Sequence, residues 1–229
     1  MVRSLPRQAL RILIGTRHFF TLHSGKMILS EPDLRKAVKR GEIGFTPELE
    51  EQQWGQASIN LRLGFQFTTL RDNKNITVSV AEGIGAVSNL GLWDTKEFKE
   101  ADELGSRESY ELKPNHFVLA KTYESIKIPT NLIARVEGRS TYARMGLSMH
   151  QTAPWVQPGW SGPLILEIAN LGKITIKLTP LIDRPCQLTF FKLTSPVPDE
   201  LAYGARPTDQ FKDQSHPLDQ KKKKAKGSR

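Results

Sequence analysis

The sequence contains a single cysteine, Cys186, among its 229 residues. One cysteine cannot form a disulfide within the chain. Extracellular domains are often stabilised by disulfides, whereas a reducing compartment keeps thiols free. The scarcity of cysteine therefore favours a cytoplasmic location.

The sequence also lacks a long hydrophobic run. Its most apolar stretch, residues 9–22, is interrupted by Arg11, Arg17 and His18. A helix that spans a bilayer needs about 18 or more consecutive apolar residues. The same stretch has no small-residue cleavage site of the kind that follows a secretory signal. We therefore expect neither a membrane segment nor a secretory signal here.

Acidic residues are absent from both ends of the chain. Residues 1–26 contain five Lys or Arg, and residues 221–229 contain six. The net charge of +9 would by itself suggest a nucleic-acid partner, yet residues 27–220 hold 22 basic and 24 acidic residues, a net charge of −2. The basic excess thus lies in the ends, which argues against nucleic acid as the partner of the folded part.

The two ends are interpreted as separate from the folded part. Residues 1–26 form a basic extension, which is either sequence upstream of a natural start at Met27 or an Arg-rich transit peptide. Residues 218–229 form a Lys-rich tail that we expect to be disordered. Between them we predict one β domain, 27–200, followed by a C-terminal segment, 201–217.

Helical periodicity is scarce, and strand-like alternation dominates. One helix is expected after Ser30, with an apolar stripe that includes Leu34 and a stop at Gly41. Pro, Gly, Asn and Asp separate the strand-like runs, which are typical of a mainly β sandwich or barrel. These expected strands are 59–63, 76–80, 116–122, 132–137, 164–169, 174–179 and 187–193. Residues 83–108 are expected to be a polar insertion with a short helix near 95–101.

Residues 138–144, Gly-Arg-Ser-Thr-Tyr-Ala-Arg, place two arginines and two hydroxyls within six positions. A short helical turn there would direct backbone N–H groups, hydroxyls and guanidinium groups to one place, as a phosphate chain requires. The alternative is a solvated turn with ordinary surface arginines.

Glu167 is the only charged residue in the apolar run 164–169, which follows the turn-rich segment 158–163. Strand alternation places Leu164, Leu166 and Ile168 on one face and Glu167 on the other. A carboxylate in such a run belongs either to a solvated face or to a functional site. The sequence alone leaves both interpretations open.

Taken together, these segments resemble the dCTP deaminase family of the dUTPase-like superfamily. The resemblance is carried by G-R-S-T-x-A-R-x-G-L (138–147), H-x-T-A-P (150–154), P-G-W-x-G (158–162) and L-E-I-x-N (166–170), together with 57–64, 117–120 and 124–129. Tyr203, Phe211 and Gln214 match the spacing of that family's C-terminal lid. The resemblance covers residues 27–217 and implies a dUTPase-like β-fold with a short N-terminal helix. It also implies a homotrimer with active sites between subunits.

The resemblance further implies roles for individual residues. Glu167 would take a proton from the water that attacks C4 of cytosine, while Ser140 and the backbone of Ala153 hold that water and Arg144 orders the site. The residues implied to bind the dCTP substrate are Arg139, Ser140, Thr141, Arg144, Gln157, Trp160, Gln187, Tyr203, Phe211 and Gln214. Trp160 is equally interpretable as a core aromatic, and Gln187 as a core strand amide.

The resemblance implies Mg²⁺ as the metal ion and no zinc. Mg²⁺ would be bound through the nucleotide triphosphate, which needs few protein ligands. Zinc is not expected, because zinc nucleobase deaminases carry H-x-E and P-C-x-x-C segments and neither segment occurs here.

Two positions depart from the family pattern. Gln157 stands where many relatives have an Asp that in dUTPases activates water, and Gln210 stands where some relatives have a lid lysine. A neutral amide cannot act as a general base. The sequence therefore favours a deaminase that releases dUTP. The alternatives are a bifunctional deaminase–diphosphatase that gives dUMP, and a non-catalytic nucleotide-binding regulator that uses its basic ends.

Overall fold

A computed structural model describes residues 27–72, 75–100, 105–209, 211, 214 and 216 of the chain. The predicted extension 1–26 and the tail 218–229 lie outside these residues, as do parts of the segment 201–217. Within the described part, no helix is long and apolar enough to cross a membrane.

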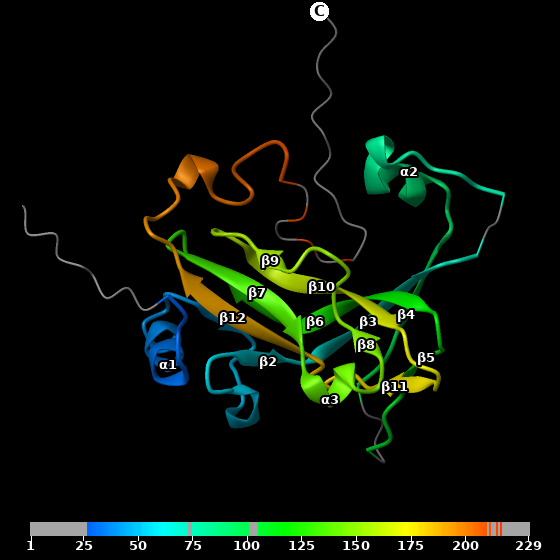
Figure 1. Cartoon of the computed structure of the whole chain (residues 1–229), viewed down its shortest axis with the longest axis horizontal. Coiled ribbons are helices and arrows are strands. Elements are labelled where there is room, and N and C mark those ends of the chain that lie inside the picture. Colours follow the sequence, from blue (N-terminus) through cyan, green and yellow to red (C-terminus); the bar gives the residue numbers. More distant parts are fainter. Residues whose placement is uncertain are drawn as a thin grey trace, which may run out of the picture.

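The one helix expected near the N-terminus is present as α1, Glu31–Lys39 (Figure 1). Leu34 and Ala37 are its buried residues, so the predicted apolar stripe is the face that packs on the core. Ser30 precedes the helix without a side-chain cap to a backbone N–H. Its hydroxyl lies 3.4 Å from the Asp33 carboxylate instead.

Two larger sheets and one small sheet make up most of the fold (Figure 1). The six-stranded sheet has the order β4-β3-β6-β10-β8, with β1 paired to β6; the four-stranded sheet has the order β2-β12-β7-β9; and β11 pairs with β5. The strands of these three sheets are β1 Gly44–Thr46, β2 Ile59–Leu61, β3 Leu63–Leu70, β4 Trp93–Glu97, β5 Tyr110–Leu112, β6 Phe117–Lys127, β7 Leu132–Gly138, β8 Leu147–Ser148, β9 Trp155–Val156, β10 Ser161–Asn170, β11 Ile176–Leu178 and β12 Cys186–Lys192. The remaining short elements are η1 Glu51–Gln53, η2 Val80–Glu82, α2 Gly83–Asn89, α3 Ser140–Ala143 and η3 Asp199–Leu201.

Both larger sheets contribute to one apolar core. Alternate residues of β10, including Leu166 and Ile168, are buried from one side, while Val136 of β7 and Phe190 of β12 are buried from the other. The mainly β fold and six of the seven expected strand regions are confirmed, because strand alternation reports directly which face meets the core.

The prediction for residues 76–80 is wrong. These residues form no strand, and Val80 begins the 3-10 turn η2 with 96% of its side chain exposed. Alternating apolar residues predict a strand only where a neighbouring strand is available to pair with. Here Ile76 and Val78 instead line a pocket beneath α2.

The predicted helix near 95–101 is also wrong within its described residues. Residues 93–97 are β4, which pairs antiparallel with β3 from Leu70↔Trp93 to Gln66↔Glu97. Lys, Glu and Ala favour a helix locally, but edge pairing outweighs that preference. Phe98 is buried beside Phe67, with ring centroids 5.3 Å apart, so the chain leaving β4 is held on the core.

A buried ion pair joins two parts of the fold. Arg62 Nε donates to Glu124 Oε1 at 2.7 Å, and the Glu124 side chain is fully buried. Glu124 also accepts from the backbone N–H of Arg62 at 2.9 Å and from Gln53 Nε2 at 2.9 Å. The carboxylate therefore ties η1 and the β2–β3 connection to β6.

We expect Glu124→Ala to lower the free energy of unfolding by about 3 kcal/mol, because it leaves the Arg62 guanidinium without its buried partner. Urea denaturation followed by tryptophan fluorescence measures the change. The matched control is Glu111→Ala, which removes an exposed pair with Lys177 at 3.8 Å and should cost less than about 1 kcal/mol. Equal losses in the two variants would contradict a structural role for Glu124.

Candidate functional site

A tight turn between β9 and β10 organises the candidate site. The turn contains Pro158, Gly159 and Trp160, and the Trp160 N–H donates to Gln157 O at 3.1 Å. Gly159 has a φ of +85°, and a Cβ placed on it would lie 2.8 Å from the Ala202 side chain. Only glycine therefore lets the chain at Ala202 approach this turn so closely.

The C-terminal segment docks on that turn. The Tyr203 N–H donates to Pro158 O at 2.8 Å, and the rings of Tyr203 and Trp160 lie 5.1 Å apart. The Tyr203 hydroxyl in turn accepts from the Phe211 N–H at 3.2 Å. Tyr203 thus links the predicted lid segment to the β9–β10 turn.

A buried carboxylate shapes the turn that follows Tyr203. Asp209, which is 4% exposed, accepts from the Gly204 N–H at 2.9 Å and pairs with the Arg206 guanidinium at 3.2 Å. Burial alone would raise the pKa of Asp209, but these donors outweigh it and hold the pKa below its usual value. The ionised carboxylate therefore holds residues 204–209 in one turn.

A cavity of about 250 Å³ lies between this segment and the sheets. Its lining consists of Ile84, Leu119, Val136, Ala153, Trp155, Val156, Gln157, Trp160, Leu164, Ile165, Glu167, Tyr203, Phe211 and Gln214. Seven of these were predicted site residues: Ala153, Gln157, Trp160, Glu167, Tyr203, Phe211 and Gln214. The cavity is mainly apolar with a few polar groups, which is typical of a small-molecule site.

Glu167 supplies the carboxylate among the described lining residues. It lies on β10, half-buried, on the opposite face of the strand from the core residues Leu166 and Ile168. The Gln151 N–H donates to Glu167 Oε2 at 3.0 Å, and Gln151 Nε2 donates to the Glu167 backbone carbonyl at 3.1 Å. Glu167 thus lines the cavity and is bonded on both its carboxylate and its backbone carbonyl by Gln151.

Trp160 fits both interpretations of its role. Its side chain is 8% exposed and belongs to the core, with Nε1 donating to Gly162 O at 3.0 Å. The same side chain lines the cavity. It is therefore a fixed wall of the site.

The arginine-rich turn, residues 138–144, lies outside the lining of the described cavity. Residues 140–143 form the predicted helical turn as α3, and Ser140, Thr141 and Arg144 are exposed. Arg139 Nη1 donates to Arg184 O at 3.0 Å. None of these four residues lines the described cavity, so one chain does not bring them together with Glu167.

Gln187 belongs to the neighbourhood of α3. Its Nε2 donates to Gly138 O at 3.1 Å, and its Oε1 accepts from the Ser58 hydroxyl at 3.1 Å. These bonds are those of a structural amide on β12, and Gln187 does not line the described cavity.

Two titratable groups in or near these regions stay neutral at physiological pH. Burial raises the pKa of the Tyr203 phenol, so its hydroxyl keeps its proton and can donate to a ligand in the cavity. Burial raises the pKa of the Cys186 thiol to about 12, which excludes a thiolate nucleophile at this position near neutral pH.

Sequence reasoning missed several residues of the site. Ile165 shares the strand face of Glu167, so alternation along β10 could have identified it. Gln151 bonds to Glu167 and lies between the recognised motif positions His150 and Thr152, but its type carried no chemical signal. Ile84 comes from the insertion and had no sequence signal. The described residues contain no group of three His, Cys, Asp or Glu side chains suited to a metal ion.

Comparisons with known proteins agree with one another. A protein-family model described as dCTP deaminase-like matches residues 28–193. A protein of Methanosphaera stadtmanae named "dCTP deaminase, dUMP-forming" is 36% identical over 182 residues, which cover 80% of this chain and 86% of that protein. A Rhodospirillum rubrum protein named "dCTP deaminase" is 33% identical over 192 residues, which cover 84% of this chain and 95% of that protein.

A solved structure shares the fold. The 2′-deoxycytidine 5′-triphosphate deaminase from Agrobacterium tumefaciens matches with a TM-score of 0.54 at 18% sequence identity. The match covers 73% of this chain and 48% of that chain. At this identity the likeness establishes similarity of fold alone.

Proposed function

This chain belongs to the dCTP deaminase-like family, and we propose that it binds dCTP and hydrolyses it at C4 of cytosine, releasing ammonia. The resemblance predicted from the motifs is thereby confirmed at the level of the family. The observation that carries the proposed activity is Glu167, a positioned carboxylate in a mainly apolar cavity. The proposed product and residue roles go beyond family membership.

In the proposed reaction, Glu167 accepts a proton from a water molecule as the water oxygen forms a bond to C4 of cytosine. The bond between C4 and the exocyclic amino nitrogen then breaks, and Glu167 returns its proton to the amino group, which leaves as ammonia. The second proton of the water moves from the new C4 hydroxyl to N3, so that C4 becomes the carbonyl carbon of uracil. Ala153 lies in the same lining as Glu167, which supports the proposal that its backbone helps to hold the water. A mainly apolar cavity strengthens such hydrogen bonds, because few competing waters enter.

We propose that the active site is completed by a second subunit within a homotrimer. Arg139, Ser140, Thr141 and Arg144 suit a triphosphate and the attacking water, yet they do not line the cavity of their own described chain. The exposed apolar side chains of Met145 and Leu171 lie close to this region, since the Leu171 N–H donates to Gly146 O at 2.8 Å. A contact with a neighbouring subunit at this face would remove both side chains from water.

The guanidinium and hydroxyl groups near α3 are compatible with a nucleotide that carries Mg²⁺ on its phosphates. Guanidinium and hydroxyl groups bind phosphate oxygens, and Mg²⁺ on the triphosphate would neutralise phosphate charge without a protein cage. Thr141 and Arg144 are exposed and thus accessible to phosphates. The requirement for Mg²⁺, the lack of zinc and the cytoplasmic location remain predictions.

The product of the proposed reaction is dUTP if the cavity acts as its residues suggest. Gln157 lines the cavity at the position where an Asp would activate a second water, and its amide cannot accept that proton. A dUMP-forming reaction is the second candidate. It is favoured by the names of relatives from Methanosphaera stadtmanae, Methanobrevibacter smithii and Dictyoglomus thermophilum, each of which gives dUMP as the product.

We expect purified protein incubated with dCTP and Mg²⁺ to release one ammonia for each dUTP formed, as measured by nucleotide chromatography and an ammonia assay. The reason is that Glu167 is present and the position of a second base is occupied by Gln157. Appearance of dUMP and pyrophosphate in place of dUTP would support the second candidate, a dUMP-forming reaction. Unchanged dCTP despite measurable dCTP binding would contradict the enzyme and favour the nucleotide-binding regulator.

A further inference from the structure

The segment between β3 and β4 contributes a residue to the cavity lined by Glu167, which we call the nucleotide cavity because of its proposed function. This residue is Ile84 of α2, a helix that stands out from the sheets at the end of that connection (Figure 1). Ile84 shares the lining with Glu167 and Trp160 of the β10 region and with Phe211 of the C-terminal segment. One wall of the cavity thus comes from a part of the chain outside the family motifs quoted above.

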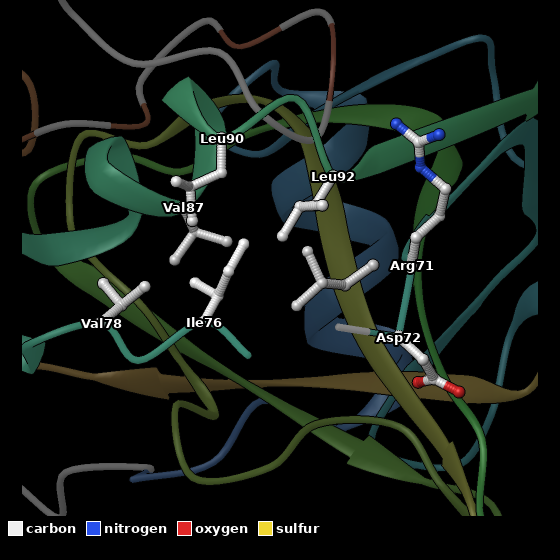
Figure 2. A pocket seen from close by; sticks show the side chains of 8 residues that line it. Arg71, Asp72, Ile76, Val78, Val87, Leu90 and Leu92 are labelled. Atoms are coloured by element: carbon white, nitrogen blue, oxygen red, sulfur yellow. The ribbon is translucent and has the colours of Figure 1, made fainter. Parts of the chain in front are cut away.

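Helix α2 is only lightly packed. None of its seven residues, all of which the structure describes, is buried. A second cavity, of about 350 Å³, lies against the helix and is lined by Val87, Leu90 and Leu92 together with Ile76 and Val78. Figure 2 shows these aliphatic side chains gathered around the space, with the charged ends of Arg71 and Asp72 directed away from it. A short helix with so little burial belongs to the low-stability part of a fold, from which mobile binding elements are drawn.

Two cavities therefore meet helix α2, each through a different side chain, although the two residues are neighbours along one side of the helix. Ile84 lines the nucleotide cavity, whereas Val87, three residues later, lines the second cavity. The helix thus offers a matched pair of aliphatic residues, of which one contacts the proposed substrate space. Any effect that arises from destabilising the helix should appear in both.

The C-terminal segment is connected to the same part of the chain. The Thr95 hydroxyl of β4 lies 3.3 Å from His216 Nε2, and it also bonds the Thr68 hydroxyl of β3 at 2.9 Å. Phe211 and Gln214, which precede His216, line the nucleotide cavity together with Ile84. The described residues of the C-terminal segment and the β3–β4 segment thus line the cavity together.

We propose that Ile84 is a specificity-determining residue, whose side chain limits the space available to the nucleotide and excludes water from it. The proposal rests on the proposed function, since it takes the cavity of Glu167 to be the dCTP site. A branched aliphatic side chain at the wall gains contact with a nucleotide that fits and clashes with a larger one. It offers nothing to proton transfer, so its contribution belongs to binding and selection rather than to the chemical step.

The test compares Ile84→Ala with Val87→Ala in the full chain. Ile84→Ala should raise the KM for dCTP and the dissociation constant measured by calorimetry by about fivefold, because it removes apolar contact. Its kcat should stay within about twofold of the wild type. Relative to dCTP, its kcat/KM for the larger nucleotides 5-methyl-dCTP or CTP should rise by about fivefold or more. Val87→Ala should leave all of these quantities unchanged, with thermal unfolding of both variants as the check on folding.

Equal values for the two variants, or a loss confined to kcat, would overturn the role of Ile84. The calorimetric measurement separates this result from a failure of the proposed function. If the wild-type protein binds dCTP without deaminating it, weaker binding by Ile84→Ala alone would still support Ile84 as the wall of the nucleotide site. If the two variants bind dCTP as tightly as the wild type, the proposal fails whatever the activity.

Discussion

Replacement of Glu167 by glutamine is expected to lower the kcat for dCTP deamination by about 10³-fold, the usual contribution of a positioned general base. Glutamine keeps the size of the side chain and can still accept the N–H of Gln151, which lies 3.0 Å from Glu167 Oε2. It cannot take a proton from water or return one to the departing amine. Ammonia release under saturating dCTP measures the loss.

Binding separates a catalytic role for Glu167 from a structural one. The dissociation constant of dCTP should change by less than about threefold in Glu167→Gln, because the loss is confined to the chemical step. Glu111→Gln serves as the matched control, since Glu111 is an exposed carboxylate on β5 whose Lys177 partner is also exposed. Retained deamination by Glu167→Gln, or an equal loss in Glu111→Gln, would contradict the proposed mechanism.

Mixing two inactive variants is expected to restore activity if the site is shared between subunits. Glu167→Gln lacks the base, and Arg144→Ala lacks a guanidinium that does not line the same chain's cavity. In a trimer that contains both variants, about one of the three sites combines an intact Glu167 from one subunit with an intact Arg144 from its neighbour. Co-expression of the two variants under different affinity tags, followed by tandem purification, supplies the mixed protein for the ammonia assay.

The control for this experiment is the double variant. A chain that carries both Glu167→Gln and Arg144→Ala, co-expressed with Glu167→Gln alone, contains no intact Glu167 and should stay inactive. Recovery of about a third of wild-type activity in the first mixture only would support a composite site. The absence of recovery in a mixture that purifies as a trimer would contradict it.

Strand alternation predicted most of the fold because burial follows it directly. Leu166 and Ile168 are buried on one face of β10, and Glu167 faces the opposite way. The sequence left two interpretations of Glu167 open, since a lone carboxylate in an apolar strand fits a solvated face as well as a site. In the structure, Glu167 lines a cavity together with Tyr203 and Phe211 from a distant part of the chain, which favours the functional site.

The remaining errors arise where local preference and long-range contacts disagree. Lys96 and Glu97 have helix-forming side chains but form part of β4 because β3 offers a pairing edge. Ile84 lines the cavity from α2, whereas the sequence predicts the helix of this insertion near residues 95–101. No spacing rule could have shown that Arg144 and Glu167 lie apart in one chain, because that separation depends on how the whole sheet is arranged.

Incubation of the protein with dCTP in heavy-oxygen water tests the central claim most directly. If Glu167 activates a water molecule that attacks C4, mass spectrometry should find one heavy oxygen in the uracil base, together with one ammonia released for each base converted. Glu167→Gln should show neither. Unchanged cytosine after saturating dCTP is bound, or converted nucleotide without heavy oxygen in its base, would contradict hydrolytic deamination by this site.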